Sequence, residues 1–237
     1  MKRIILMVMK LILKAPYYLL GIWWSGKCKD YDLNKAFAFV KKVAMAANRA
    51  GRVTIESYGI ENLPKEDGFI FFPNHQGLYD VLAFLESCPR PFAFVIKKEA
   101  SNVILLKQVI SALRSFVMDR EDIRQSMQVI NQVTEEVKKG RNFLIFPEGT
   151  RSKLGNQLLP FKGGTFKSAM KAKCPIVPCA LIDSFKPFDE STIKPVTVKL
   201  IYLPPIYYEE YKSMKSPEIA DMVKARIEAA IAEKIKN

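Results

Sequence analysis

The sequence predicts an α/β fold in which a single sheet flanked by helices fills residues 51–237, preceded by an amphipathic two-helix appendage over residues 1–50. Three observations support this assignment. From residue 52 onward, short apolar runs alternate with helical stretches, as expected for helices packed on the faces of one sheet. The 237 residues are 49% hydrophobic, which suffices for a buried core and excludes a disordered chain. No Pro/Gly/Ser-rich linker divides the chain, so the appendage belongs to the same unit.

Each element of the main domain follows from a local pattern. Runs rich in Val, Ile, Phe and Tyr predict strands at 53–58, 68–72, 91–96, 142–146, 175–182 and 195–203. Helical periodicity and its breakers predict helices at 78–87, 100–113, 121–138, 164–173 and 217–236. In the helix at 121–138 the apolar residues trace one face and Gly140 follows its end, while the last helix begins at Ser216-Pro217.

The first 24 residues are mostly apolar, but Lys10 and Lys14 interrupt them. The longest uncharged run, residues 15–26, is shorter than the ~20 residues that a membrane span needs. The long apolar region and the cleavage site of a signal peptide are not evident either. On a helix that ends at Pro16, the side chains of Arg3, Lys10 and Lys14 fall on one narrow face.

Aromatic side chains follow this helix, and they include both tryptophans of the chain: Tyr17, Tyr18, Trp23 and Trp24. Trp and Tyr favour the boundary between a membrane and water. We therefore predict that this basic amphipathic segment lies in a membrane interface and that its basic and aromatic side chains bind there. The alternative is an ordinary core helix with a solvated lysine stripe.

A second helix is predicted over residues 33–50, with Asp32 as its N-cap and Gly51 just past its end, so that the two helices form a short hairpin. Residues 1–60 carry 11 Lys and Arg but only 3 Asp and Glu, within a net charge of +13 for the chain. This bias indicates a polyanionic partner, either anionic lipid or nucleic acid. The apolar and aromatic neighbours favour lipid over nucleic acid, for which no motif is present.

Several classes of site lack their motifs. The chain has 1 His and 4 Cys with no CxxC, which leaves neither a usual zinc site nor a disulfide scaffold. The P-loop, Rossmann and nucleophile-elbow motifs are also absent. The cysteines are expected to be buried free thiols: Cys28, Cys88, Cys174 and Cys179. Free thiols without a signal peptide favour a peripheral or monotopic protein on the cytoplasmic face of a membrane.

Polar residues follow three apolar runs where each run ends. The runs and the residues that follow them are 68–73 with His75 and Asp80, 115–118 with Asp119 and Arg120, and 142–146 with Glu148 and Arg151. In α/β folds, ligands bind beyond the carboxyl ends of the strands. These loops therefore predict a functional site rather than a packing pattern.

His75 and Asp80 have the spacing of a general base and its supporting carboxylate if His75 ends a strand and Asp80 begins the next helix. No Ser or Cys lies close to them as an evident nucleophile, so the base would activate a hydroxyl of the substrate. The alternative is a histidine that caps a helix beside a surface aspartate.

Arg120 and Arg151 suit a phosphate group, to which Lys98 could add charge. The alternative is that both arginines form surface ion pairs, Arg151 with Glu148. Gly149 forms a tight turn that could let a substrate approach the backbone.

Four segments resemble the motif boxes of the glycerolipid acyltransferase family, in the family's order and over about residues 53–182. The resemblance is closest to its lysophosphatidic acid acyltransferases (1-acyl-sn-glycerol-3-phosphate O-acyltransferases). The segments are Asn74-His75-Gln76-Gly77-Leu78-Tyr79-Asp80 for the NHxxxxD box, Phe116-Val117-Met118-Asp119-Arg120 for the arginine box, Phe146-Pro147-Glu148-Gly149-Thr150-Arg151-Ser152 for the FPEGTRS box, and Val177-Pro178-Cys179-Ala180 for the Val-Pro box.

Three departures from the family pattern bear on the choice of acceptor more than on the chemistry. Many members have a Ser inside the first box, where this chain has Gln76-Gly77-Leu78. The arginine box often has Ile where Met118 stands, and an Ile-Pro stretch common before it reads Val103-Ile104-Leu105-Leu106 here.

The resemblance implies a glycerol-3-phosphate acyltransferase-like fold and direct acyl transfer to the sn-2 hydroxyl of lysophosphatidic acid. His75 would take the hydroxyl proton, oriented by Asp80, with no metal and no cofactor beyond acyl-CoA or acyl carrier protein as donor. The residues that would bind substrate are Asn74, Lys98, Arg120, Glu148, Gly149, Thr150 and Arg151. The alternatives are another acceptor, such as glycerol-3-phosphate or another lysolipid, and a non-catalytic lipid-binding protein of the same fold.

Overall fold

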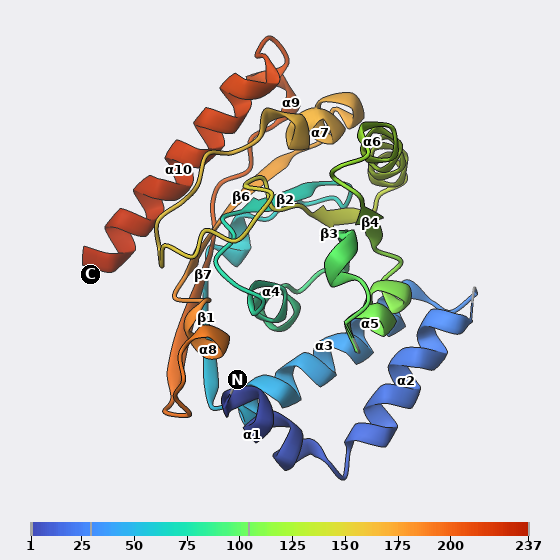
Figure 1. Ribbon diagram of the computed structural model, residues 1–237. Coiled ribbons are helices and arrows are strands. Elements are labelled where there is room, and N and C mark those ends of the chain that lie inside the picture. Colours follow the sequence, from blue (N-terminus) through green and yellow to red (C-terminus); the bar gives the residue numbers. More distant parts are fainter. Residues whose placement is uncertain (1, 29, 104, 237) are drawn as a thin grey trace.

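The computed structural model describes residues 2–28, 30–103 and 105–236 (Figure 1). Its centre is a seven-stranded sheet in the order β1-β7-β6-β2-β5-β3-β4. Neighbouring strands are parallel except β6 and β7, which are antiparallel. The strands are β1 (Val53–Tyr58), β2 (Ile70–Pro73), β3 (Phe92–Lys97), β4 (Phe116–Met118), β5 (Asn142–Leu144), β6 (Ile176–Ile182) and β7 (Val196–Tyr202).

Every predicted strand is present, and the run at 115–118 forms the edge strand β4. The predicted helix at 100–113 differs, because it is divided into a 3-10 turn η2 (Lys98–Ala100) and the helix α5 (Leu106–Ala112). Leu105, just before α5, has a positive φ of 72°, which a continuous helix does not allow. Residue 104 of that prediction lies outside the described residues.

Helices cover both faces of the sheet (Figure 1). One face packs against α3 (Leu33–Ala50), α4 (Asp80–Ser87) and α5, and the other against α6 (Ile123–Lys138), α7 (Lys167–Ala172) and α10 (Ser216–Lys236). From Phe69, just before β2, the side chains alternate: Phe69 and Phe71 enter the first core, while Ile70 and Phe72 enter the second. A strand buried on both faces explains why this stretch is continuously apolar. The short helices are η1 (Ile60–Asn62), η3 (Gly163–Phe166), α8 (Lys186–Asp189) and α9 (Tyr208–Tyr211).

The N-terminal region has three helices, which corrects the predicted two-helix appendage. They are α1 (Lys2–Leu11), α2 (Ala15–Lys27) and α3. Pro16 begins α2 instead of ending the first helix, because proline lacks an N–H that the first turn does not need. The third helix starts and ends as predicted, with the Asp32 carboxylate accepting from two backbone N–H groups and Gly51 at the C-cap. The division of the chain at residue 50 stays a prediction.

No single helix in the described part of the chain has the length and apolar composition of a membrane span. Among the described helices, only α1 and α2 taken together have this length and composition, and the pair is bent by 94° at the break between the two helices.

Arg3 does not share the exposed face of Lys10 and Lys14, so that part of the prediction is wrong. Its side chain is 0% exposed, and its guanidinium donates to the carbonyl oxygens of Gly51, Pro187 and Lys194. The first turn of α1 is thereby fixed between the end of α3 and the segment around α8.

Tyr18 is buried too, against Phe39 of α3, which corrects its predicted place at the surface. The other members of the predicted interfacial set are exposed: Lys10, Lys14, Tyr17, Trp23 and Trp24. Helix α2 therefore presents one aromatic face to the protein and another to its surroundings.

Replacing Arg3 with Met should lower the free energy of unfolding by about 3 kcal/mol, because three carbonyl groups lose a charged donor in a buried site. Urea denaturation measures this change. Lys10→Met is the matched control on the same helix, since Lys10 is exposed, and it should stay within about 0.5 kcal/mol of the parent protein. Equal losses in both variants would contradict the anchoring role of Arg3.

Candidate active site

The predicted polar residues meet at the carboxyl ends of β2 and β5, which are parallel neighbours. His75 follows β2, Asp80 begins α4, and Glu148 follows β5. Parallel strands end at the same edge of a sheet, so residues far apart in sequence come together there. Arg120 follows β4 at the same edge, two strands beyond β5 in the sheet order.

His75 and Asp80 form a hydrogen-bonded pair. His75 Nδ1 lies 2.7 Å from Asp80 Oδ2, and the imidazole stacks on Phe146 at a centroid distance of 4.1 Å. Because Asp80 accepts from Nδ1, the neutral ring carries its proton there and leaves Nε2 as a base. No described residue hydrogen-bonds to Nε2, and the side chain is 20% exposed, so the basic atom is available to a substrate.

Asp80 is 0% exposed and accepts from several donors besides His75. The backbone N–H of Gln76 donates to Oδ2 at 2.8 Å, and that of Gly77 lies 3.1 Å from both oxygens. The hydroxyl of Ser184 lies 2.6 Å from Oδ1. These donors replace the hydrogen bonds to water that burial removes, and they fix the carboxylate beside the imidazole.

Glu148 supports the backbone of His75 and forms no ion pair with Arg151 in the described structure. One of its carboxylate oxygens accepts from the N–H of His75 at 2.7 Å and the other from the N–H of Leu159 at 3.1 Å. The N–H of Ser152 donates to the carbonyl of His75 at 2.8 Å. Burial raises the pKa of the Glu148 carboxyl, against the opposing effect of its two N–H donors. The FPEGTRS loop therefore holds both backbone groups of His75.

Asn74 also has a structural position, which corrects its expected contact with substrate. Its side-chain N–H donates to the carbonyl of Leu181 at 3.0 Å, and its oxygen accepts from the N–H of Leu181 at 2.7 Å. The side chain is buried and joins the end of β2 to β6.

The predicted phosphate-binding cations differ in whether a carboxylate already pairs with them. Lys98 is exposed and paired with Asp119, with its Nζ 3.0 Å from Oδ2. This pairing raises the pKa of Lys98 and lowers that of Asp119. Arg120 is exposed and Arg151 is half-buried beside the exposed Thr150. Neither arginine forms an ion pair with a described carboxylate, so both remain available to an anion.

Lys162 is a further cation at this edge that the sequence did not single out. Gly149 has a positive φ of 74°, and a Cβ built there would lie 3.0 Å from Nζ of Lys162. This positive φ favours glycine, and the absence of a Cβ leaves room for the Lys162 side chain beside the turn. The signal in the sequence, a lysine beside Gly163-Gly164, is too common to identify it.

The cysteines are not placed to act as nucleophiles. Cys88, Cys174 and Cys179 are buried, and Cys28 is exposed, which corrects its expected burial. Burial raises the pKa of Cys88 to about 11 and that of Cys174 to about 12, so both are neutral thiols at physiological pH. In the described part of the chain, no group of three or more His, Cys, Asp or Glu residues could hold a metal ion.

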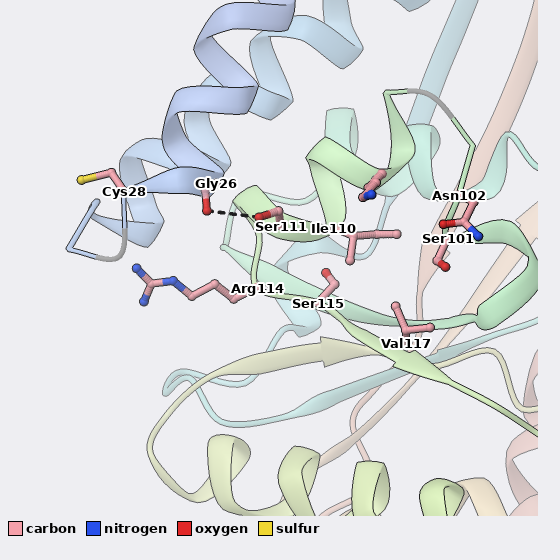
Figure 2. A pocket seen from close by; sticks show the side chains of 10 residues that line it. Gly26, Cys28, Ser101, Asn102, Ile110, Ser111, Arg114, Ser115 and Val117 are labelled. Atoms are coloured by element: carbon pink, nitrogen blue, oxygen red, sulfur yellow. Dashed lines mark hydrogen bonds between the residues drawn. The ribbon is translucent and has the colours of Figure 1, made fainter. Parts of the chain in front are cut away.

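A cavity of about 690 Å³ lies away from the His75–Asp80 pair, between the end of α2, helix α5 and strand β4 (Figure 2). Its wall includes Ser101, Asn102, Lys107 and Arg114, and the hydroxyl of Ser111 donates to the carbonyl of Gly26 across it. None of the predicted site residues is in its described lining.

A family model described as Acyltransferase matches residues 54–182, which contain the His75–Asp80 pair and the FPEGTRS loop. The chain belongs to the acyltransferase family. This membership confirms the resemblance drawn from the four boxes. All four lie in or directly after strands of this acyltransferase: β2, β4, β5 and β6.

Similar curated proteins are named 1-acyl-sn-glycerol-3-phosphate acyltransferases. The chloroplastic protein BAT2 of Brassica napus is 33% identical over 153 residues, which cover 63% of this chain and 44% of the relative. The Salmonella typhimurium protein is 31% identical over 165 residues, covering 69% and 67%, and the Escherichia coli protein is 30% identical over 179 residues, covering 75% and 69%. The matched part of this acyltransferase thus spans less than half of the Brassica protein.

A solved structure has the same fold. The 1-acyl-sn-glycerophosphate (LPA) acyltransferase PlsC from Thermotoga maritima superposes with a TM-score of 0.74 over 97% of each chain, at 23% identity. This likeness confirms the predicted sheet flanked by helices.

Proposed function

We propose that the protein transfers an acyl chain from an acyl thioester to the sn-2 hydroxyl of lysophosphatidic acid, giving phosphatidic acid. The observation that carries the proposal is the His75 imidazole, which is hydrogen-bonded through Nδ1 to a buried carboxylate and has no partner at Nε2 among the described residues. This arrangement suits a general base that acts on a hydroxyl of the substrate. The names of the similar curated proteins support the choice of acceptor.

In the proposed reaction, Nε2 of His75 takes the proton of the sn-2 hydroxyl while the hydroxyl oxygen attacks the carbonyl carbon of the thioester. The tetrahedral intermediate then collapses, the C–S bond breaks, and the leaving thiolate takes the proton from the imidazolium. The Asp80 carboxylate stabilises the transient charge on the ring, and the FPEGTRS loop fixes the ring's position through the backbone. No covalent acyl-enzyme forms, because no described Ser or Cys side chain is hydrogen-bonded to His75.

The acceptor is drawn from a lipid bilayer, and we propose that α1 and α2 hold the enzyme against the cytoplasmic face of that bilayer. Exposed apolar side chains recur along both helices and the break between them: Ile4, Ile5, Val8, Met9, Ile12, Leu13, Tyr17, Leu19, Leu20, Trp23 and Trp24. Lys10, Lys14 and Lys27 are exposed among them and suit anionic headgroups.

An assay with a panel of acceptors and donors tests this function. Purified protein is mixed with acyl-CoA or acyl carrier protein and with lysophosphatidic acid, glycerol-3-phosphate or monoacylglycerol in vesicles, and products are identified by mass spectrometry. Phosphatidic acid should form fastest from lysophosphatidic acid. Faster acylation of glycerol-3-phosphate would replace the proposed acceptor, and no product from any combination would contradict an enzymatic role.

Arg151→Gln should raise the KM for lysophosphatidic acid about 10-fold, because the variant loses the positive charge that binds the acceptor phosphate. The rate with monoacylglycerol, which has no phosphate, should change little. Steady-state kinetics with both acceptors measure the difference. Lys98→Gln is the control, since Lys98 is already paired with Asp119, and its effect should be smaller. An equal loss with both acceptors would contradict phosphate binding by Arg151.

A further inference from the structure

Ser184 belongs to none of the motif boxes, yet it touches the centre of the site. It lies two residues past the end of β6 and is 0% exposed. Its hydroxyl is 2.6 Å from Asp80 Oδ1 and 2.9 Å from the side-chain oxygen of Gln76. Its backbone N–H donates to the same Gln76 oxygen at 2.8 Å.

The Ser184 hydroxyl has one proton, which it can donate either to the Gln76 side-chain oxygen or to Asp80 Oδ1. The Gln76 oxygen already has the Ser184 N–H as a donor, so it does not need the hydroxyl. Asp80 Oδ1 has no other side-chain donor in the described structure, and its remaining contact is a Gly77 N–H shared with Oδ2. The shorter contact to a charged acceptor takes the proton.

We propose that Ser184 is a positioning residue for the catalytic pair: its hydroxyl holds Oδ1 of Asp80 so that Oδ2 faces Nδ1 of His75. The proposal rests on the function proposed above for His75. Without this hydroxyl, Oδ1 would keep only the 3.1 Å contact with the Gly77 N–H that it shares with Oδ2, so the carboxylate would be held less firmly in the orientation that presents Oδ2 to the imidazole.

The segment that carries Ser184 is itself held in place on both sides. Asp183 has a left-handed φ of 63°, a conformation that aspartate tolerates, and it turns the chain out of β6. Its backbone N–H and its carboxylate both contact the side-chain amide of Asn156, and Lys186 donates to the same carboxylate. Asn156 in turn accepts from the amide of Gln76.

The same segment packs directly on the first box. A Cβ built at Gly77 would lie 3.2 Å from Cα of Phe185 and 3.4 Å from the carbonyl oxygen of Ser184. Contacts this close mean that position 77 has little room for a side chain while the 184–185 segment occupies this place. The hydroxyl that serves Asp80 therefore comes from beyond β6, 104 residues along the chain.

Kinetics of four proteins test the proposal: the parent, Ser184→Ala, Ser184→Thr and Ser184→Val. Ser184→Ala should lower kcat about 10- to 100-fold, as expected for a lost hydrogen bond to a charged group, and should leave the KM for acyl-CoA unchanged. Thr and Val have the same shape, so any overpacking of the buried site affects both equally. Only Ser184→Thr keeps the hydroxyl, so its kcat should exceed that of Ser184→Val by a similar factor. Equal kcat in Thr and Val would overturn the proposal.

A spectroscopic readout works without substrate. The chain has 1 His, so every imidazole signal of histidine-labelled protein belongs to His75. The resonance of the Nδ1 proton, which faces Asp80, should keep its position in Ser184→Thr and change in the Ala and Val variants. An unchanged resonance in all of them would overturn the proposal even if activity fell. If the parent protein acylated no acceptor, the proposed function would fail, and this spectrum would still decide whether Ser184 positions Asp80.

Discussion

His75→Ala should lower kcat/KM for acyl transfer by about 10³- to 10⁴-fold, because the substrate hydroxyl loses the proposed base, Nε2 of the imidazole. Asp80 keeps its three other donors in the variant, so we expect the fold to persist. Steady-state rates of phosphatidic acid formation measure the effect, and thermal unfolding confirms that the protein is intact.

His75→Asn is the matched variant. An asparagine N–H can replace Nδ1–H as a donor to Asp80, but it offers no atom in place of Nε2. This variant should therefore be more stable than His75→Ala and equally inactive. If it recovered substantial activity, the contact with Asp80 would matter and the base would not, and the proposed mechanism would be abandoned.

Replacing three exposed apolar residues of the N-terminal helices with Glu should weaken binding to anionic vesicles at least ~100-fold. The residues are Leu13, Leu20 and Trp24, which are 94%, 64% and 61% exposed. Each gains roughly 1.5 kcal/mol or more on burial in the interface, and each new carboxylate is repelled by anionic lipid. Flotation of the protein with liposomes measures the loss.

Two controls make this test specific. Ile123→Glu changes another exposed apolar residue, 78% exposed, at the start of α6, and it should leave flotation unchanged. Turnover of a water-soluble, short-chain acceptor should be preserved in the triple variant, since its substitutions lie outside the catalytic pair. Unchanged flotation of the triple variant would refute interfacial binding by α1 and α2.

The sequence predicted the parts of the fold and site that local patterns encode. The continuously apolar stretch at Phe69–Phe72 predicted a strand, and in the structure its side chains enter the cores on both faces of the sheet. Polar residues directly after such strands must meet at one edge, so the pattern of the chain alone suffices to bring His75, Asp80 and Glu148 together.

The parts that were missed depend on partners far away in the chain. Helical spacing placed Arg3 beside Lys10 and Lys14, but its acceptors are carbonyl groups at the end of α3 and around α8, up to 191 residues away. No sequence pattern identifies a backbone carbonyl as an acceptor. Ser184 follows a strand end like the other site residues, but a single serine there is too ordinary to stand out. Glu148 was predicted to bind substrate, whereas in the structure its two carboxylate oxygens accept from the backbone of His75 and Leu159, partners that could be assigned only from the fold.

The hydrogen bonds between the FPEGTRS loop and the backbone N–H and carbonyl of His75 have a consequence for the synthesis of the chain. Glu148 lies 73 residues after His75, and the hydroxyl on Asp80 comes from a residue later still. A ribosome-bound chain that ends before these residues contains His75 and Asp80 but lacks the groups that fix the backbone of His75 and Oδ1 of Asp80. With the proposed function, we therefore expect the ability to transfer an acyl chain to arise late in synthesis, after the central strands have paired.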